Sequence, residues 1–180
     1  WEKSPGEDLL RLVKRDCGGR LPLIAEDLGI ITQEVKRLRD KFSLPGMKIL
    51  QFGFDGAIDN PYLPENIKGD NWVVYSGTHD NPTTIGWWNL LNHEEKERVL
   101  ERSDPKIDSP VWKIIDMGLS TGAGFVIVPL QDLLCLGDEA RFNTPGSIGN
   151  NWTWRLKNFD INFENALINY RERGNYWGRK

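Results

Sequence analysis

The chain has 180 residues, 39% hydrophobic and 27% charged, which is typical of a folded domain with a core and excludes a disordered segment. A formal net charge of -3 gives no general attraction to nucleic acid or to an anionic membrane, so neither is an expected partner. No apolar run approaches the length that a membrane-spanning helix needs.

Two cysteines and two histidines limit the redox and metal chemistry that the sequence can indicate. Cys17 and Cys135 have no motif partner, so we interpret them as two reduced thiols of a cytosolic protein. His79 and His93 are far apart in the chain and no Cys-x-x-Cys pair accompanies them, so we predict no metal site.

Hydrophobic periodicity predicts helices and strands in alternation along the chain. Helices are expected over residues 7–17, 32–41 and 93–102, from Pro110 onward, and over 163–174. Strands are expected over residues 21–25 and 47–52, from Trp72, and over 124–130. Short apolar strands separated by helices favour an α/β fold with parallel strands, either a doubly wound sheet or a (β/α)8 barrel.

Three helix starts have local signals. Thr32 is a plausible N-cap, Asn92 and Glu95 have the spacing of a capping box, and Pro110 suits the first position of a helix. These signals depend only on neighbouring residues, so we expect the three helices to begin where the signals stand.

Two acidic residues stand where apolar runs end. Residues 21–25 lead into Glu26 and Asp27, and the run from Trp72 leads into His79 and Asp80. If Glu26 lies at the end of a buried strand, desolvation would raise its pKa, as a general acid near neutral pH requires. Two carboxylates at the ends of two strands point to glycoside chemistry. Asp27 is interpreted as structural.

Eight tryptophans are many for 180 residues. Aromatic faces stack on sugar rings, but they also fill cores. For the adjacent Trp87 and Trp88, and for Trp152 and Trp154, we favour structural packing over sugar binding.

Nine segments in this order resemble the C-terminal part of a 4-alpha-glucanotransferase, a family also called amylomaltase or disproportionating enzyme. They are residues 24–29 (IAEDLG), 44–47 (LPGM), 50–52 (LQF), 60–64 (NPYLP), 77–81 (GTHDN), 86–88 (GWW), 126–132 (VIVPLQD), 141–146 (RFNTPG) and 151–155 (NWTWR). The resemblance covers about residues 1–156. The ending, residues 176–180, is unlike the family pattern.

The resemblance implies a (β/α)8 TIM barrel of which this chain is the C-terminal half, strands five to eight. It implies a single catalytic barrel domain, with residues 1–180 as its C-terminal portion and the N-terminal half not present. The activity implied is transfer of alpha-1,4-glucan segments to an acceptor sugar with retention of configuration. The implied partner is a malto-oligosaccharide or alpha-glucan, the cofactor is none, and the location is cytoplasmic, or a plastid if the source is a plant.

The resemblance also assigns roles to residues. Glu26 is the implied general acid/base, Asp80 the implied transition-state stabiliser, and His79 and Asn143 are implied substrate contacts. The family nucleophile is an aspartate in an Arg-x-Asp segment, and no such segment precedes Glu26. Because a retaining mechanism needs both groups, we expect these 180 residues alone to be inactive. An alpha-amylase-like hydrolase and a non-catalytic glucan-binding module remain as alternatives.

Overall fold

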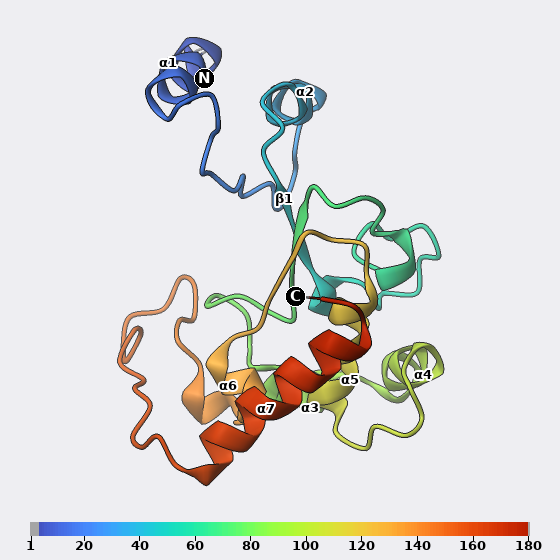
Figure 1. Ribbon diagram of the computed structural model, residues 1–180. Coiled ribbons are helices and arrows are strands. Elements are labelled where there is room, and N and C mark those ends of the chain that lie inside the picture. The colour runs from blue at the N-terminus through green and yellow to red at the C-terminus, as the bar shows by residue number, and fades with distance from the viewer. Residues whose placement is uncertain (1–3, 180) are drawn as a thin grey trace.

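The computed structural model describes residues 4–179. Trp1, Glu2, Lys3 and Lys180 lie outside the described residues. Figure 1 shows two parts, with helices α1 (Gly6–Asp16) and α2 (Gln33–Lys41) at one end and a larger body of strands and helices at the other. Strand β1 (Gly46–Ile49) runs from α2 into the body.

The sheet has three parallel strands in the order β1, β2 (Trp72–Tyr75) and β3 (Phe125–Ile127). Gly46 pairs with Trp72 in the first ladder, and Val73 pairs with Phe125 in the second. The connection between β1 and β2 contains the short helices η1 (Leu50–Phe52) and η2 (Pro64–Asn66). The prediction of parallel strands with helical connections is therefore confirmed.

The other helices follow β2 and β3. They are α3 (Thr84–Leu90), α4 (His93–Arg102), α5 (Pro110–Ser120), α6 (Leu130–Leu133), η3 (Asp138–Ala140) and α7 (Ile161–Tyr176). The three predicted starts are confirmed: Thr32 accepts from Val35 N, Asn92 and Glu95 form both bonds of the capping box, and α5 begins at Pro110.

The predicted strand over residues 21–25 is wrong, because this segment is extended without forming a ladder in the described chain. It makes one backbone hydrogen bond to the start of β1, from Ala25 N to Pro45 O at 2.8 Å. Leu23 and Ile24 are 42% and 47% exposed, since no described element covers them. The strand expected over 47–52 is shorter than predicted, because the chain turns into η1 at Leu50.

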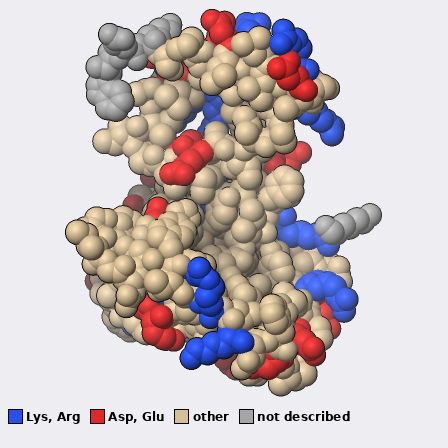
Figure 2. Space-filling model, turned by 90° about the vertical axis from the view of Figure 1, so that its left-hand side faces the viewer, with Lys and Arg blue, Asp and Glu red and all other residues tan. Residues whose placement is uncertain are grey.

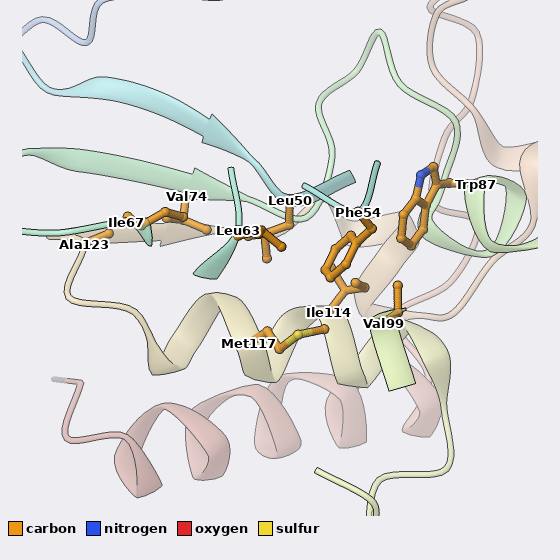
Figure 3. Packing of buried hydrophobic residues seen from close by; sticks show 10 residues of the cluster. All are labelled: Leu50, Phe54, Leu63, Ile67, Val74, Trp87, Val99, Ile114, Met117 and Ala123. Atoms are coloured by element: carbon orange, nitrogen blue, oxygen red, sulfur yellow. The ribbon is translucent and has the colours of Figure 1, made fainter. Parts of the chain in front are cut away.

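Helix α5 lies at the centre of the larger body. Ile114 and Met117 face a hydrophobic cluster that includes Leu50 and Val74 of the sheet side, and Figure 3 shows this packing. Another face of α5 belongs to a second cluster, which contains Val111, Ile115, Leu119, Leu133 and Ala166. Because α5 packs against both clusters, it connects the sheet to α7.

The C-terminal segment is fixed against the end of α5. Arg179 donates to the backbone oxygens of Leu119, Thr121 and Ala123 at 2.7–2.9 Å, and Trp177 Nε1 donates to Asp116 Oδ1 at 2.8 Å. These carbonyls lie at and beyond the last turn of α5, where a cation is favourable. The chain ending therefore holds a defined position against α5.

The surface shows no large patch of one charge on the face in Figure 2, where acidic and basic side chains are mixed on both parts of the molecule. The same view shows a waist between the α1–α2 part and the larger body. Among residues 4–179, none of the helices combines the length and the apolar character needed to cross a membrane. Cys17 and Cys135 are both exposed and free.

Candidate active site

A cluster of polar side chains lies beyond the carboxyl end of β2, which is where parallel α/β sheets place their functional residues. Here the chain turns tightly. Asn81 Oδ1 accepts from Thr78 N at 2.9 Å and from Thr78 Oγ1 at 2.7 Å. His79 and Asp80 lie inside this turn, and both side chains are about half exposed. The turn therefore presents an imidazole and a carboxylate together.

Asn143 comes to the same place from a loop far along the chain. Its Nδ2 donates to Asp80 Oδ1 at 2.5 Å, and its backbone N–H donates to His79 O at 3.1 Å. His79 Nε2 lies 3.4 Å from the same Asp80 oxygen. Three of the four residues predicted for the site are thus in direct contact. The other oxygen, Asp80 Oδ2, has no protein partner among the described residues and can accept hydrogen bonds from a ligand.

A cavity of about 370 Å³ adjoins this group. His79, Arg141, Phe142 and Trp154 are among the residues that line it. Trp152 lies beside His79, with ring centroids 5.0 Å apart, and it is 53% exposed. Trp152 is therefore packed beside His79 and Phe142 at the surface and not in the core. An exposed aromatic ring next to polar side chains is suited to stacking on a sugar ring.

Glu26 is the fourth predicted site residue, and it lies between α1 and α2 in the chain. It lies in the extended segment before β1 and is exposed, so the burial that the sequence predicted for it is not found. No hydrogen bond or ion pair between described residues joins it to Asp80, His79 or Asn143. The structure brings those three together and leaves Glu26 separate from them.

Asp27 is the anchor next to Glu26, in agreement with its structural interpretation. Its Oδ1 accepts from Met47 N at 2.7 Å, and its Oδ2 is ion-paired with Arg39 of α2. Both side chains are largely buried, and the Arg39 guanidinium also lies over the ring of Trp72 at 4.7 Å. Asp27 therefore ties the segment that carries Glu26 to β1, β2 and α2.

Asp132 fixes the ends of the turn that carries His79 and Asp80, although sequence reasoning assigned it no role. It is 2% exposed and accepts from Ser76 Oγ at 2.6 Å, Thr84 N at 2.7 Å and Thr84 Oγ1 at 2.8 Å. Burial raises the pKa of this carboxyl, and the three hydrogen bonds oppose that shift. The signal that could have found it is its place in the segment 126–132, which follows an expected strand.

Nothing in the described chain forms a metal centre of acidic, histidine or cysteine side chains, since no group of three or more such residues has a suitable arrangement. What the site offers chemically is a half-exposed carboxylate, an amide donor and an imidazole beside aromatic rings. This set can bind and orient hydroxyl groups of a polyhydroxylated ligand.

Comparison with known proteins gives a consistent result. A family model described as 4-alpha-glucanotransferase matches residues 1–161. The chain is 43% identical over 166 residues to the 4-alpha-glucanotransferase of Thermus thermophilus, covering 87% of this chain and 32% of that protein. It is 42% identical over 183 residues to the chloroplastic/amyloplastic 4-alpha-glucanotransferase of Arabidopsis thaliana, covering 99% and 31%. The chain thus spans about a third of the length of these relatives.

Solved structures agree with the sequence relatives. The amylomaltase of Streptococcus agalactiae, solved in complex with acarbose, superposes with a TM-score of 0.90 at 32% identity, over 99% of this chain and 36% of that one. An amylomaltase from Corynebacterium glutamicum superposes with a TM-score of 0.60 at 15% identity and supports the fold alone.

Proposed function

This chain belongs to the 4-alpha-glucanotransferase family, and from that premise we propose that it forms part of an enzyme that transfers alpha-1,4-glucan segments to an acceptor sugar. The observation that carries the proposal is the contact of Asp80 with Asn143 and His79 at the carboxyl end of β2, beside a cavity. We further propose that the chain supplies strands five to eight of a (β/α)8 barrel. The parallel ladders of β1, β2 and β3 support three of these strands. The extended residues 21–25 are proposed to form the fourth strand when the rest of the barrel lies beside them.

The substrate we propose is a malto-oligosaccharide or longer alpha-glucan. The aromatic rings of Trp152, Trp154 and Phe142 around His79 support this choice, because sugar rings stack on aromatic faces. The complex of the Streptococcus relative with acarbose supports it as well. Plant relatives are named chloroplastic/amyloplastic, and we propose a plastid for a plant source and the cytoplasm otherwise.

The proposed reaction has two steps with retention of configuration. In the first, Glu26 donates its proton to the glycosidic oxygen while the bond from C1 to that oxygen breaks. A carboxylate nucleophile, which is proposed to come from outside these 180 residues, bonds to C1. In the second, the hydroxyl of an acceptor sugar gives its proton to Glu26 and its oxygen displaces the nucleophile from C1. Water gives hydrolysis by the same route, so transfer requires that the acceptor outcompete water.

Asp80 stabilises the transition state in this proposal. Asn143 and His79 contact one of its oxygens, which leaves the other to bind sugar hydroxyls. A fixed carboxylate that binds more tightly as the ring flattens toward the oxocarbenium ion lowers the barrier. His79 and Asn143 are proposed as substrate contacts in the same place, while Glu26 is positioned by the anchored Asp27 beside it.

The test compares two variants of the protein at its natural length, Glu26→Gln and the matched control Glu34→Gln. Glu34 is exposed on α2 and loses the same charge. With maltotriose as substrate, we expect Glu26→Gln to lower glucose release by about 10²–10⁴-fold and Glu34→Gln to leave it unchanged. Full activity of Glu26→Gln would contradict the assignment of the general acid.

Product analysis on the wild-type protein separates the alternatives. Transfer yields longer and shorter glucans with little net gain of reducing ends, whereas an alpha-amylase-like hydrolase releases a new reducing end at each turnover. Binding of maltodextrin without turnover would support a glucan-binding module instead. Either of these last two results would overturn the transferase proposal.

A further inference from the structure

We propose that Arg141 is a positioning residue that sets the relative placement of Asp80 and Asn143, an inference that rests on the proposed function. Its guanidinium donates from Nη2 to the backbone oxygen of Asp80 at 2.8 Å and from Nε to the backbone oxygen of Asn143 at 2.8 Å. One planar group thus binds the main chain of both residues whose side chains meet at the site.

The two segments that Arg141 joins are distant in sequence. Asp80 follows β2, whereas Asn143 lies in the loop after η3, and no shared helix or strand fixes their separation. Between the segments run the side-chain bond from Asn143 to Asp80 and the backbone bond from Asn143 N to His79 O. Arg141 adds a bond to each main chain, and its fixed fork geometry sets the distance between them.

Other residues fix the two ends of the turn, and Arg141 binds the backbone in its middle. Asp132 binds Ser76 and Thr84 at the two ends of the turn, and Asp138 Oδ1 accepts from Thr83 N at 3.0 Å. Asp80 lies between these anchors. Among the described residues, the Arg141 guanidinium is the hydrogen-bond donor to its backbone oxygen. Without that bond, the backbone at Asp80 loses its link to the Arg141 guanidinium, while the ends of the turn stay fixed and the side-chain bond from Asn143 remains.

The charge of Arg141 is balanced within the same framework. Its Nη1 lies 3.9 Å from Asp138 Oδ2, and its side chain is 21% exposed. Asp138 approaches α3 at Gly86, where a side chain would collide with the Asp138 carboxylate. Because a mutually supporting set of bonds orients the guanidinium, Arg141 is suited to position the site rather than to move with the substrate.

A small displacement of Asp80 would cost activity in the transition state. A misplacement of about 1 Å by a residue away from the reacting atoms can lower the rate by about 10²-fold. Since Asp80 is proposed to act mainly as the sugar ring flattens, its displacement should lower kcat more than it raises KM. A residue that only stabilises the fold would lower the yield of folded protein without this kinetic pattern.

The experiment uses the natural-length protein, with Arg141→Ala, Arg141→Lys and the matched control Arg179→Lys. Arg179 also donates to three backbone oxygens, but it does so at the end of α5. With maltotriose, we expect Arg141→Ala to lose about 10²-fold in kcat with little change in KM, and Arg141→Lys to lose less. Millimolar guanidinium should restore part of the activity of Arg141→Ala but not that of Glu26→Gln.

Two results would overturn the inference. One is a kcat of Arg141→Ala within about threefold of wild type. The other is a loss that guanidinium does not restore and that Arg179→Lys reproduces, since that would mean a general effect on folding. Arg141→Lys keeps the inference testable if Arg141→Ala does not fold. An inactive wild-type protein would contradict the proposed function itself, so the two failures are distinguishable.

Discussion

The part of the chain that carries Glu26 and the part that carries Asp80 are stabilised in different ways. In residues 4–45, none of the described side chains of α1 or α2 is buried, and the buried apolar side chains are Phe42 and Leu44, just after α2. In residues 46–179, α5 has eight buried residues and packs between two hydrophobic clusters. Burial of apolar area supplies most of the stability of the second part and little of that of the first.

This difference teaches how each half of the proposed site is positioned. Asp80 stands on a turn whose ends are hydrogen-bonded to the buried Asp132. Glu26 depends on a polar anchor, the contact of Asp27 with Arg39 and with the start of β1. The placement of Glu26 relative to Asp80 therefore depends on a few polar contacts on one side and on a packed core on the other.

The largest expected effect compares Ile114→Ala with Leu9→Ala. Ile114 is fully buried in the cluster beneath the sheet, so its truncation leaves a cavity and should lower the free energy of unfolding by about 2–5 kcal/mol. Leu9 is 60% exposed on α1, and its truncation should cost less than about 0.5 kcal/mol. Urea unfolding of the 180-residue chain measures both. Equal losses would mean that α1 is packed as well as α5.

A second effect concerns the buried carboxylate of Asp132. Asp132→Ala leaves buried donors of Ser76 and Thr84 unpaired, at about 1–3 kcal/mol for each such donor. Asp132→Asn keeps an oxygen for Thr84 N and gains an amide that can donate to a hydroxyl, so it should cost less than alanine does. Denaturant unfolding of the two variants checks this order. An asparagine variant as unstable as the alanine variant would show that the bonds need the charged group.

The raised pKa of Asp132 predicts how the stability difference between wild type and Asp132→Asn changes with pH. Because burial raises the pKa of Asp132 in the folded state, the folded protein binds this proton more tightly than the unfolded chain does. That contribution is fully present below the ordinary carboxyl pKa and is lost as pH rises through the raised one. Wild type should therefore lose stability relative to Asp132→Asn as pH rises above the ordinary carboxyl pKa and through the raised one. A difference that grows in the opposite direction would contradict the raised pKa.

Local chemistry explains which elements the sequence could predict. The starts of the helices at Thr32, Asn92 and Pro110 follow from side chains within a few residues, so no knowledge of the tertiary fold was needed. The segment 21–25 has the composition of a buried strand, but a ladder needs a neighbour, and the described chain gives it one hydrogen bond from Ala25. Helix α3 was missed as an element because seven residues give little periodic signal.

The sequence could predict only those residues of the candidate site that directly follow a strand. The place of His79 and Asp80 after the strand from Trp72 could be read from the apolar run, because the carboxyl ends of parallel strands share one edge. The contact with Asn143 comes from a loop without regular structure, and only the resemblance pointed to it. Arg141 acts through backbone oxygens, which no side-chain pattern identifies.

The smallest expected effect tests the polar contact between α1 and α2. Glu7 accepts from Lys41 at 2.6 Å and from Arg11 at 2.5 Å, and the bond from Lys41 is the main cause that lowers its pKa to about 2. The stability from this lowered pKa is present above the ordinary value of 4.5 and is lost as pH falls toward 2. Because the carboxylate is exposed to solvent, Glu7→Gln should lower Tm only slightly at neutral pH and low salt. In 1 M salt the Debye length is about 3 Å, so the ion pair is screened and we expect no change in Tm. Thermal melts of Glu7→Gln and the control Glu34→Gln check this. A salt-independent loss as large as that of Asp132→Ala would show that this pair, and not the segment at Asp27, attaches α1 to the molecule.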